Sequence, residues 1–161
     1  MNKPDFSGTL LDICLSEARK SPCKKLGFGA ILWRHGTIIG VEHNRPFPET
    51  EFVCTPECIR NSIQSRTQSM IGACAHAEER LIFSVSREQT NDAEIFVAGV
   101  KLDGTPLEKA RADFSCIRCA TAMLHAGIRG VWVFVDGDWE FVPTEAAYQT
   151  ALEYALGKRT Y

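Results

Sequence analysis

Two apolar segments separated by one helical segment constrain the fold more than any other feature of the sequence. The segments "AEIFVAGV" (93–100) and "GVWVFV" (130–135) are nearly continuous apolar runs, which is typical of strands buried on both faces. Between them, "CIRCATAMLHAGI" has a helical pattern that ends at Gly127. A strand, a helix and a strand in this order predict a parallel pair joined by a right-handed crossover.

Four further segments complete the predicted fold. Residues 5–20 carry apolar side chains at three- and four-residue spacing and predict a helix. Two apolar runs flank Arg34-His35-Gly36, which indicates a hairpin. A helix is predicted from about Ala75 to Ser86, and a last one in "PTEAAYQTALEYALG" (143–157). We therefore expect a single domain over 1–161, an α/β sandwich around a mixed sheet.

The segment 45–73 has no clear periodicity. It contains Pro46, Pro48, Pro56 and the polar run "RNSIQSRTQS". A loop of this length inside a compact domain is usually functional. We interpret 45–73 as a cysteine-bearing insertion.

Charge and cysteine content narrow the class of protein. The formal net charge is −2, so no strong basic field indicates a nucleic acid or an anionic membrane as partner. We expect neither a signal peptide in the first twenty residues nor a membrane-spanning segment, and hence a cytoplasmic protein. Seven cysteines in a reducing compartment indicate metal binding or core packing more than disulfides.

Two short motifs supply a set of metal ligands. "CAHAEER" (74–80) places His76 and Glu78 at a helix start, and "SCIRCA" (115–120) places Cys116 and Cys119 on the first turn of another helix. Helix N-termini favour thiolate, and zinc binds thiolate and neutral imidazole. His76, Cys116 and Cys119 leave a fourth position for water, with Glu78 nearby as a proton carrier.

Each motif alone has a simpler interpretation. A lone histidine at a helix start is usually a surface or capping residue, and a lone C-x-x-C can be a redox pair. A purely structural zinc would normally be closed by a fourth cysteine or histidine. The two motifs together favour a catalytic zinc.

The motifs "HAE" and "CIRC" together resemble the signature of the zinc-dependent nucleoside, nucleotide and nucleobase deaminases, H-x-E followed by P-C-x-x-C. The resemblance covers most of the chain. It implies a three-layer α/β/α sandwich around a mixed, mostly five-stranded sheet. Ser115 stands where the family has proline, which leaves the ligands intact but bears on the backbone near the leaving amine.

The resemblance also implies roles for individual residues. Zinc would activate a water, and Glu78 would move its proton to the substrate ring and then to the departing amine. Asn44, at the end of the hairpin, would contact the sugar or base, although capping a turn is an alternative role. Ala77 is a second substrate-binding candidate. Small deaminases of this type generally assemble, so we expect a homodimer or larger homo-oligomer.

The region before "HAE" looks most like the deoxycytidylate deaminases, including phage types. That group carries an insertion here, often with a second, structural zinc. "CTPEC" (54–58) has a ligand-like spacing. Cys74 has an alternative role packing under the His76 helix, Cys14 is expected in the core, and Cys23 has no assigned role. The candidate ligands of a second zinc are Cys54, Cys58, Cys74 and His43.

Three functions remain open at this point. The first is zinc-dependent hydrolytic deamination of a cytosine nucleotide or nucleoside such as dCMP or CMP. The second is deamination of a base in tRNA or single-stranded DNA, which would usually need a basic groove; guanine and other aminated heterocycles also stay open. The third is a non-catalytic zinc-binding module, against which an intact Glu78 argues.

Overall fold

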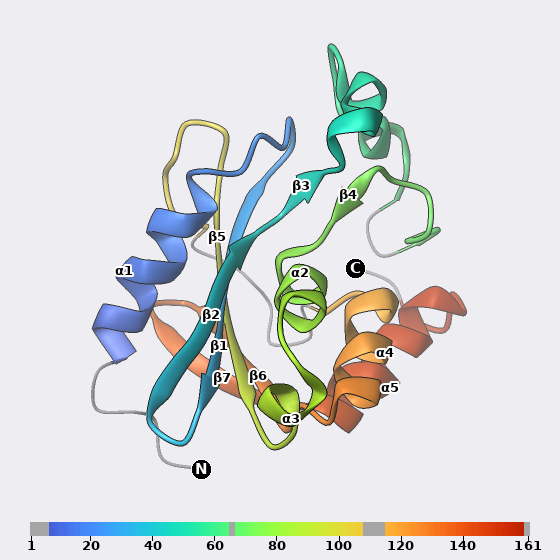
Figure 1. Cartoon of the computed structure of the whole chain (residues 1–161). Coiled ribbons are helices and arrows are strands. Elements are labelled where there is room, and N and C mark those ends of the chain that lie inside the picture. The colour runs from blue at the N-terminus through green and yellow to red at the C-terminus, as the bar shows by residue number, and fades with distance from the viewer. Residues whose placement is uncertain (1–6, 65–66, 108–114, 160–161) are drawn as a thin grey trace.

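A mixed five-stranded sheet forms the centre of the structure, a computed structural model that describes residues 7–64, 67–107 and 115–159 (Figure 1). The strand order is β2-β1-β5-β6-β7. β5 and β6 are parallel and every other neighbouring pair is antiparallel, as predicted for the crossover and the first hairpin. The strands are β1 (Gly27–Arg34), β2 (Thr37–His43), β5 (Glu94–Val100), β6 (Gly130–Val135) and β7 (Asp138–Pro143).

Helices cover both faces of this sheet, which confirms the three-layer prediction (Figure 1). One core lies under α1 and contains Leu10, Cys14 and Phe96. The other core lies under the remaining helices and contains Leu81, Val97 and Met123. No helix in the described ranges is long and apolar enough to span a bilayer. The helices are α1 (Ser7–Ala18), α2 (Ala77–Ser84), α3 (Arg87–Thr90), α4 (Ile117–Ala126) and α5 (Thr144–Ala155).

Two-residue turns define both hairpins of the sheet. His35 and Gly36 have φ values of 48° and 83° and join β1 to β2. Asp136 and Gly137 have φ values of 48° and 89° and join β6 to β7. Two successive positive φ angles suit tight hairpin turns, and Asp-Gly is a typical sequence for them. The sequence interpretation ended the sheet at residue 135 and omitted β7, although Asp136-Gly137 was the signal for it.

The helix predicted from about Ala75 to Ser86 is slightly shorter in the structure, and a second short helix follows it. α2 spans Ala77–Ser84, and the short α3 begins after Ser86. The Ser86 hydroxyl accepts a hydrogen bond from Gln89 N, and the Gln89 side chain accepts one from Ser86 N. This reciprocal capping starts a new helix just beyond the predicted end of the first, where the sequence analysis predicted none. α4 ends at Gly127 as predicted, with that glycine in the left-handed conformation at φ 73°.

The insertion extends beyond one end of the sheet (Figure 1). It contains β3 (Arg45–Pro46), two 3-10 helices, η1 (Pro48–Cys54) and η2 (Ile59–Ser62), and β4 (Cys74–Ala75). β3 and β4 pair antiparallel and bring the two ends of the insertion together. The Arg60 guanidinium donates to the backbone carbonyls of Thr67, Gln68 and Ile71 at 2.6–3.1 Å. Polar bonds rather than an apolar core therefore organise much of this segment.

We predict that Gly29→Ala destabilises the protein by about 1–3 kcal/mol, the usual cost of overpacking. A Cβ at Gly29 would meet the carbonyl oxygen of Cys14 and lie 2.8 Å from Ala18 N, so α1 would have to move off the sheet. Gly8→Ala is the matched control, because a Cβ there meets nothing within 4 Å. Chemical denaturation of the two variants measures the difference; equal stabilities would contradict this packing.

Candidate functional site

The first turn of α2 presents His76 at the helix N-cap. The backbone N–H of His76 donates to the Glu79 carboxylate at 2.9 Å, which satisfies one of the donors that a helix start leaves without a partner. The imidazole of His76 is thereby held at the end of α2 and projects toward α4. A capping interaction therefore positions the histidine that the sequence assigned as a ligand.

The first turn of α4 presents the two cysteines of the C-x-x-C motif. Cys116 is the N-cap, and its sulfur accepts a hydrogen bond from Cys119 N at 3.5 Å. Ser115 precedes them, and its side-chain hydroxyl is buried without a hydrogen-bond partner in the described structure. The position at which the resembling motif has proline thus holds a buried polar group.

The three predicted ligands converge on one point. His76 Nδ1 lies 3.1 Å from Cys119 Sγ and 3.3 Å from Cys116 Sγ, and the two sulfurs are 3.5 Å apart. Zinc bonds of about 2.3 Å to sulfur and about 2.0 Å to nitrogen in a tetrahedron need ligand separations of roughly 3.5–3.8 Å. The three groups fit zinc after shifts of a few tenths of an ångström. Three protein ligands leave one coordination position open, as a catalytic zinc requires.

The electrostatics of this cluster favour a thiolate. A hydrogen bond from Cys119 lowers the pKa of the Cys116 thiol well below its usual value, and His76 lowers it further. Burial lowers the pKa of His76, but the bond to Cys116 and the negative charges of Cys116, Glu78 and Glu79 together outweigh burial and raise that pKa to about 9. A thiolate beside a helix N-terminus is the form of cysteine that binds metal.

Glu78 is the next residue of interest because its carboxyl is buried, with 4% of the residue exposed. Burial raises the pKa of this carboxyl above its usual value, although the charge of His76 opposes the shift. A raised pKa suits a group that must both accept and release a proton. Glu78 lines the same pocket as His76 and Cys116.

That pocket has a volume of about 230 Å³ and is built from two parts of the chain. The domain core contributes the ends of β1, α2 and α4. The insertion contributes the facing wall through Ile59, Arg60, Ser69, Ile71 and Gly72. The predicted functional role of the insertion is therefore matched by its position beside the candidate metal ligands.

The two substrate-binding candidates both line the pocket. Asn44 is buried, and its side-chain amide accepts from Phe28 N at 2.7 Å and donates to Leu26 O at 3.0 Å. These bonds match the turn-capping alternative and still leave one amide hydrogen available. Ala77 is buried at the first position of α2, where its backbone faces the cluster.

Four cysteines gather on another part of the pocket wall: Cys23, Cys54, Cys58 and Cys74. Cys74 hydrogen-bonds to Cys23, which lowers the pKa of the Cys23 thiol to about 5 and raises that of Cys74. Cys74 also hydrogen-bonds to Cys54, whose pKa is raised by burial and by the charge of Cys58. Cys54, Cys58 and Cys74 were predicted together, whereas Cys23 was missed.

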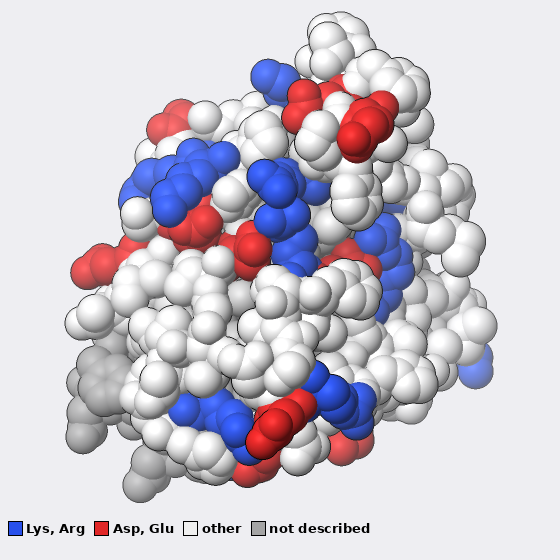
Figure 2. Space-filling model, in the orientation of Figure 1, with Lys and Arg blue, Asp and Glu red and all other residues white. Residues whose placement is uncertain are grey.

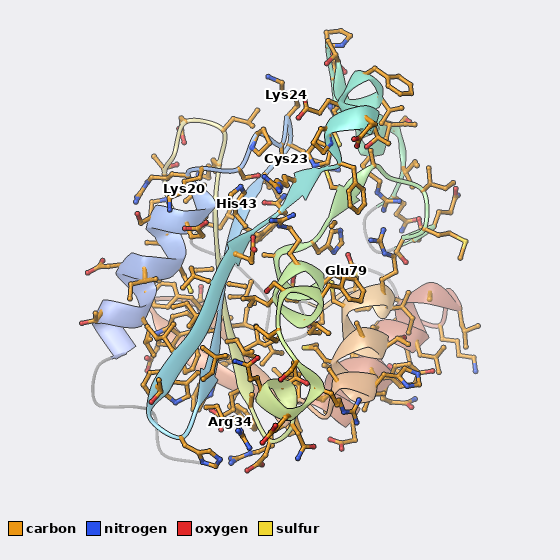
Figure 3. All side chains as sticks on the ribbon, in the orientation of Figure 1. Lys20, Cys23, Lys24, Arg34, His43 and Glu79 are labelled. Atoms are coloured by element: carbon orange, nitrogen blue, oxygen red, sulfur yellow. The ribbon has the colours of Figure 1, made fainter. Side chains whose placement is uncertain are left out.

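His43 was the fourth candidate ligand in this second set. Its Nδ1 instead lies 2.8 Å from the Glu17 carboxylate of α1. Figure 3 shows His43 and Cys23 as separate side chains near the insertion end of the sheet. The structure therefore brings Cys23, and not His43, beside the other three cysteines. "SPCKK" just before β1 was the available sequence signal, because it places a cysteine at the same end of the sheet.

Comparisons with known proteins agree with this site. Residues 5–135 match the family described as cytidine and deoxycytidylate deaminase zinc-binding region. A crystal structure of the dCMP deaminase from cyanophage S-TIM5 in apo form is similar over 93% of this chain and 94% of that one, at 18% identity and TM-score 0.55. The same enzyme in complex with dCMP and dUMP is similar over 83% of each chain, at 19% identity and TM-score 0.54. No curated protein sequence matches the chain.

We predict that His76→Ala and Cys119→Ala each lose one equivalent of zinc per chain, because two remaining ligands are too few to hold the metal. His125→Ala is the matched control, since His125 is exposed near the end of α4, away from the cluster. Elemental analysis of folded protein, purified without chelator, measures the zinc content. Full zinc in either ligand variant would contradict the assignment.

Proposed function

The chain belongs to the cytidine and deoxycytidylate deaminase family, and we propose that it catalyses hydrolytic deamination of a cytosine nucleotide or nucleoside, releasing ammonia and the uracil product. The observation that carries this proposal is the buried Glu78 carboxylate in the same pocket as His76 and Cys116. A metal-binding module without catalysis has no need of a buried carboxylate there, because burying an uncoordinated acid costs free energy.

The proposed mechanism divides the work between the metal ligands and one carboxylate. His76, Cys116 and Cys119 would hold a zinc ion, which would supply a Lewis acid that lowers the pKa of a bound water toward neutrality. Glu78 accepts a proton from the attacking water and delivers it to the ring nitrogen beside the amino-bearing carbon. Glu78 then takes the proton of the hydroxyl now bonded to that carbon and transfers it to the amine, which leaves as ammonia while the carbonyl forms. One buried carboxyl therefore serves as base and acid in sequence.

The charges on the pocket wall support a substrate that carries phosphate. Lys25, Arg60 and Arg118 all line the pocket. Arg60 is bonded to three backbone carbonyls and Arg118 to Glu79 and Ser69. Lys25 is exposed and donates to Arg60 O at 3.2 Å, and its ammonium has three donors in all. We therefore assign Lys25 as the phosphate contact. Such a contact favours dCMP or CMP over the nucleoside as the substrate.

The surface gives less support to a nucleic-acid substrate. On the face shown in Figure 2, Lys and Arg side chains are interspersed with Asp and Glu. Proteins that hold a single strand combine a continuous basic groove with stacking aromatic side chains. The alternative substrates are therefore a base in tRNA or single-stranded DNA and a free base such as guanine, and the assay below includes them.

The four-cysteine cluster supports a second, structural zinc held by Cys23, Cys54, Cys58 and Cys74. Four sulfurs form a closed tetrahedral set of the structural type. Within the described ranges, only the His76 group brings three ligand atoms within 4.8 Å of one another, so a metal here would draw the four sulfurs inward. Metal binding would join the segment before β1 to the insertion, which has little apolar core.

The proposed reaction is tested by a panel assay with ammonia release as the measurement. Purified protein is offered dCMP, CMP, deoxycytidine, cytidine, guanine and single-stranded oligonucleotides. The proposal requires turnover of a cytosine nucleotide or nucleoside, with the nucleotides preferred if Lys25 contacts phosphate. Turnover of oligonucleotides or guanine alone would show that the proposed substrate is wrong, while the proposed deamination reaction would stand.

We predict that Glu78→Gln lowers the turnover rate by about a hundred- to ten-thousand-fold, which is the usual contribution of a positioned general acid–base. Glutamine keeps the volume of the side chain and removes the ability to carry a proton. Zinc content should stay at the wild-type level, in contrast to His76→Ala. The two measurements are made on the same preparation; a full rate with full zinc would remove Glu78 from the mechanism.

We predict that replacing both Cys54 and Cys58 with serine removes one zinc per chain while the His76 site stays occupied. Proteolysis within 45–73 should become faster, since the insertion would lose an attachment. Cys14→Ala is the control, because it removes a sulfur that lies in the α1 core and away from the pocket. Unchanged zinc in the double variant would assign these cysteines to packing.

The homo-oligomer expected from the resemblance stays a prediction, because the structure contains one chain.

A further inference from the structure

Arg118 makes an unusually complete set of contacts for a residue inside the C-x-x-C motif. Its Nε donates to Glu79 Oε1 at 3.0 Å, and its Nη2 donates to Glu79 Oε2 at 2.7 Å. Its Nη1 donates to the backbone carbonyl of Ser69 at 3.0 Å. Paired, two-point bonding of this kind fixes the orientation of both groups as well as their distance.

Glu79 connects this arginine to a metal ligand. Its Oε2, which accepts from Arg118, also accepts from the backbone N–H of His76 at 2.9 Å. The Glu79 side chain is only 8% exposed, and it lies between α2 and α4 (Figure 3). An exposed ion pair contributes little to a structure, but a buried, two-point pair constrains the elements that it joins.

The sequence position of Arg118 shows which segments the ion pair constrains. Arg118 lies between Cys116 and Cys119 in the first turn of α4, so the guanidinium is attached to the segment that carries both sulfurs. Through Glu79 it is bonded to the segment that carries the imidazole. One ion pair therefore joins the two segments that carry the ligands.

The third bond of Arg118 reaches the insertion. Ser69 and Arg118 both line the pocket, and the bond to Ser69 O attaches the insertion wall to α4. Lysine could not replace this arrangement, because a single ammonium lacks the planar fork that contacts a carboxylate at two points and a carbonyl at a third.

We propose that Arg118 is a positioning residue: through Glu79 it sets the separation between His76 and the two cysteines, and through Ser69 it holds the insertion against the pocket. The metal-binding half of this inference needs no assumption about the reaction. The effect on substrate binding rests on the proposed function.

The test compares two ion pairs of the same protein. The double variant Glu79→Gln/Arg118→Met removes the proposed pair without changing net charge, so that a loss of affinity cannot be a simple charge effect. The control Glu42→Gln/Arg80→Met removes the pair between α2 and β2, in which Arg80 Nε and Nη2 lie 2.9 and 2.7 Å from Glu42 Oε2. Both pairs are partly buried, but the control pair has no bond to His76 N.

Zinc affinity is measured by competition with a chromophoric chelator, and His76→Ala protein identifies the signal of the His76 site. We expect Glu79→Gln/Arg118→Met to lower the affinity of that site about ten- to a hundred-fold, the usual effect of removing a group that orients metal ligands. The control double variant should stay within twofold of wild type. Cobalt substituted at the same site should show altered visible absorption bands in the first variant only.

Two outcomes would overturn the proposal. One is an unchanged zinc affinity and cobalt spectrum in the Glu79/Arg118 variant; the other is an equal loss in both double variants. If the double variant fails to fold, Arg118→Lys, which keeps the charge and removes the two-point bond, is measured in its place against Arg80→Lys. Lack of deaminase activity in wild-type protein would refute the proposed function and leave the metal measurements interpretable.

Discussion

The parallel pairing of β5 with β6 is the constraint on which the rest of the site depends. α2 leads through α3 into β5, and α4 leads into β6. Because the two strands run in the same direction, the two helices must also run in the same direction, and α2 and α4 pack side by side (Figure 1). Their N-termini therefore meet at the carboxyl ends of the strands, where open α/β sheets usually bind ligands.

Two helix N-termini in one place concentrate positive partial charge. Without anionic groups between them the arrangement would be unfavourable, and the Cys116 thiolate and the Glu79 carboxylate lie at that position. The fold thus creates the electrostatic conditions that a thiolate metal site needs. The ligands in turn stabilise the helix ends that the fold brings together.

Glu78 and Glu79 illustrate how one helical turn separates two functions. Successive residues of a helix point about 100° apart, so adjacent carboxylates face different surroundings. Glu78 lines the pocket, and burial raises its pKa. Glu79 faces α4 and is held by Arg118 and by the His76 backbone. Because Glu79 carries the structural bonds, Glu78 is left for the proton transfer that the proposed function assigns to it.

The sequence predicted the parts of this protein that local patterns encode. The crossover, the first hairpin and the α4 stop at Gly127 follow from short spacings, and the set of His76, Cys116 and Cys119 follows from two short motifs taken together. The second hairpin was omitted because "DWEFVP" lacks a continuous apolar run, even though a turn signal preceded it. Cys23 was unassigned because it is fifty-one positions from Cys74, and only the folded chain places both at one end of the sheet. The same holds for Arg118 and Glu79, which are thirty-nine positions apart.

Under the proposed function, the insertion would separate substrate recognition from chemistry. Its large apolar residues, such as Phe52 and Met70, are mostly exposed, so burial contributes little to holding it in place. It is attached by the β3–β4 pair, by Arg60 to its own carbonyls, by Arg118 to Ser69 and by the cysteines. Arg60, Ser69, Arg118 and the cysteines line the pocket that also contains Glu78 and His76. A segment held by a few polar and sulfur contacts can change its side chains without disturbing the sheet, so differences in substrate choice should arise there while the metal ligands and Glu78 stay on the rigid core.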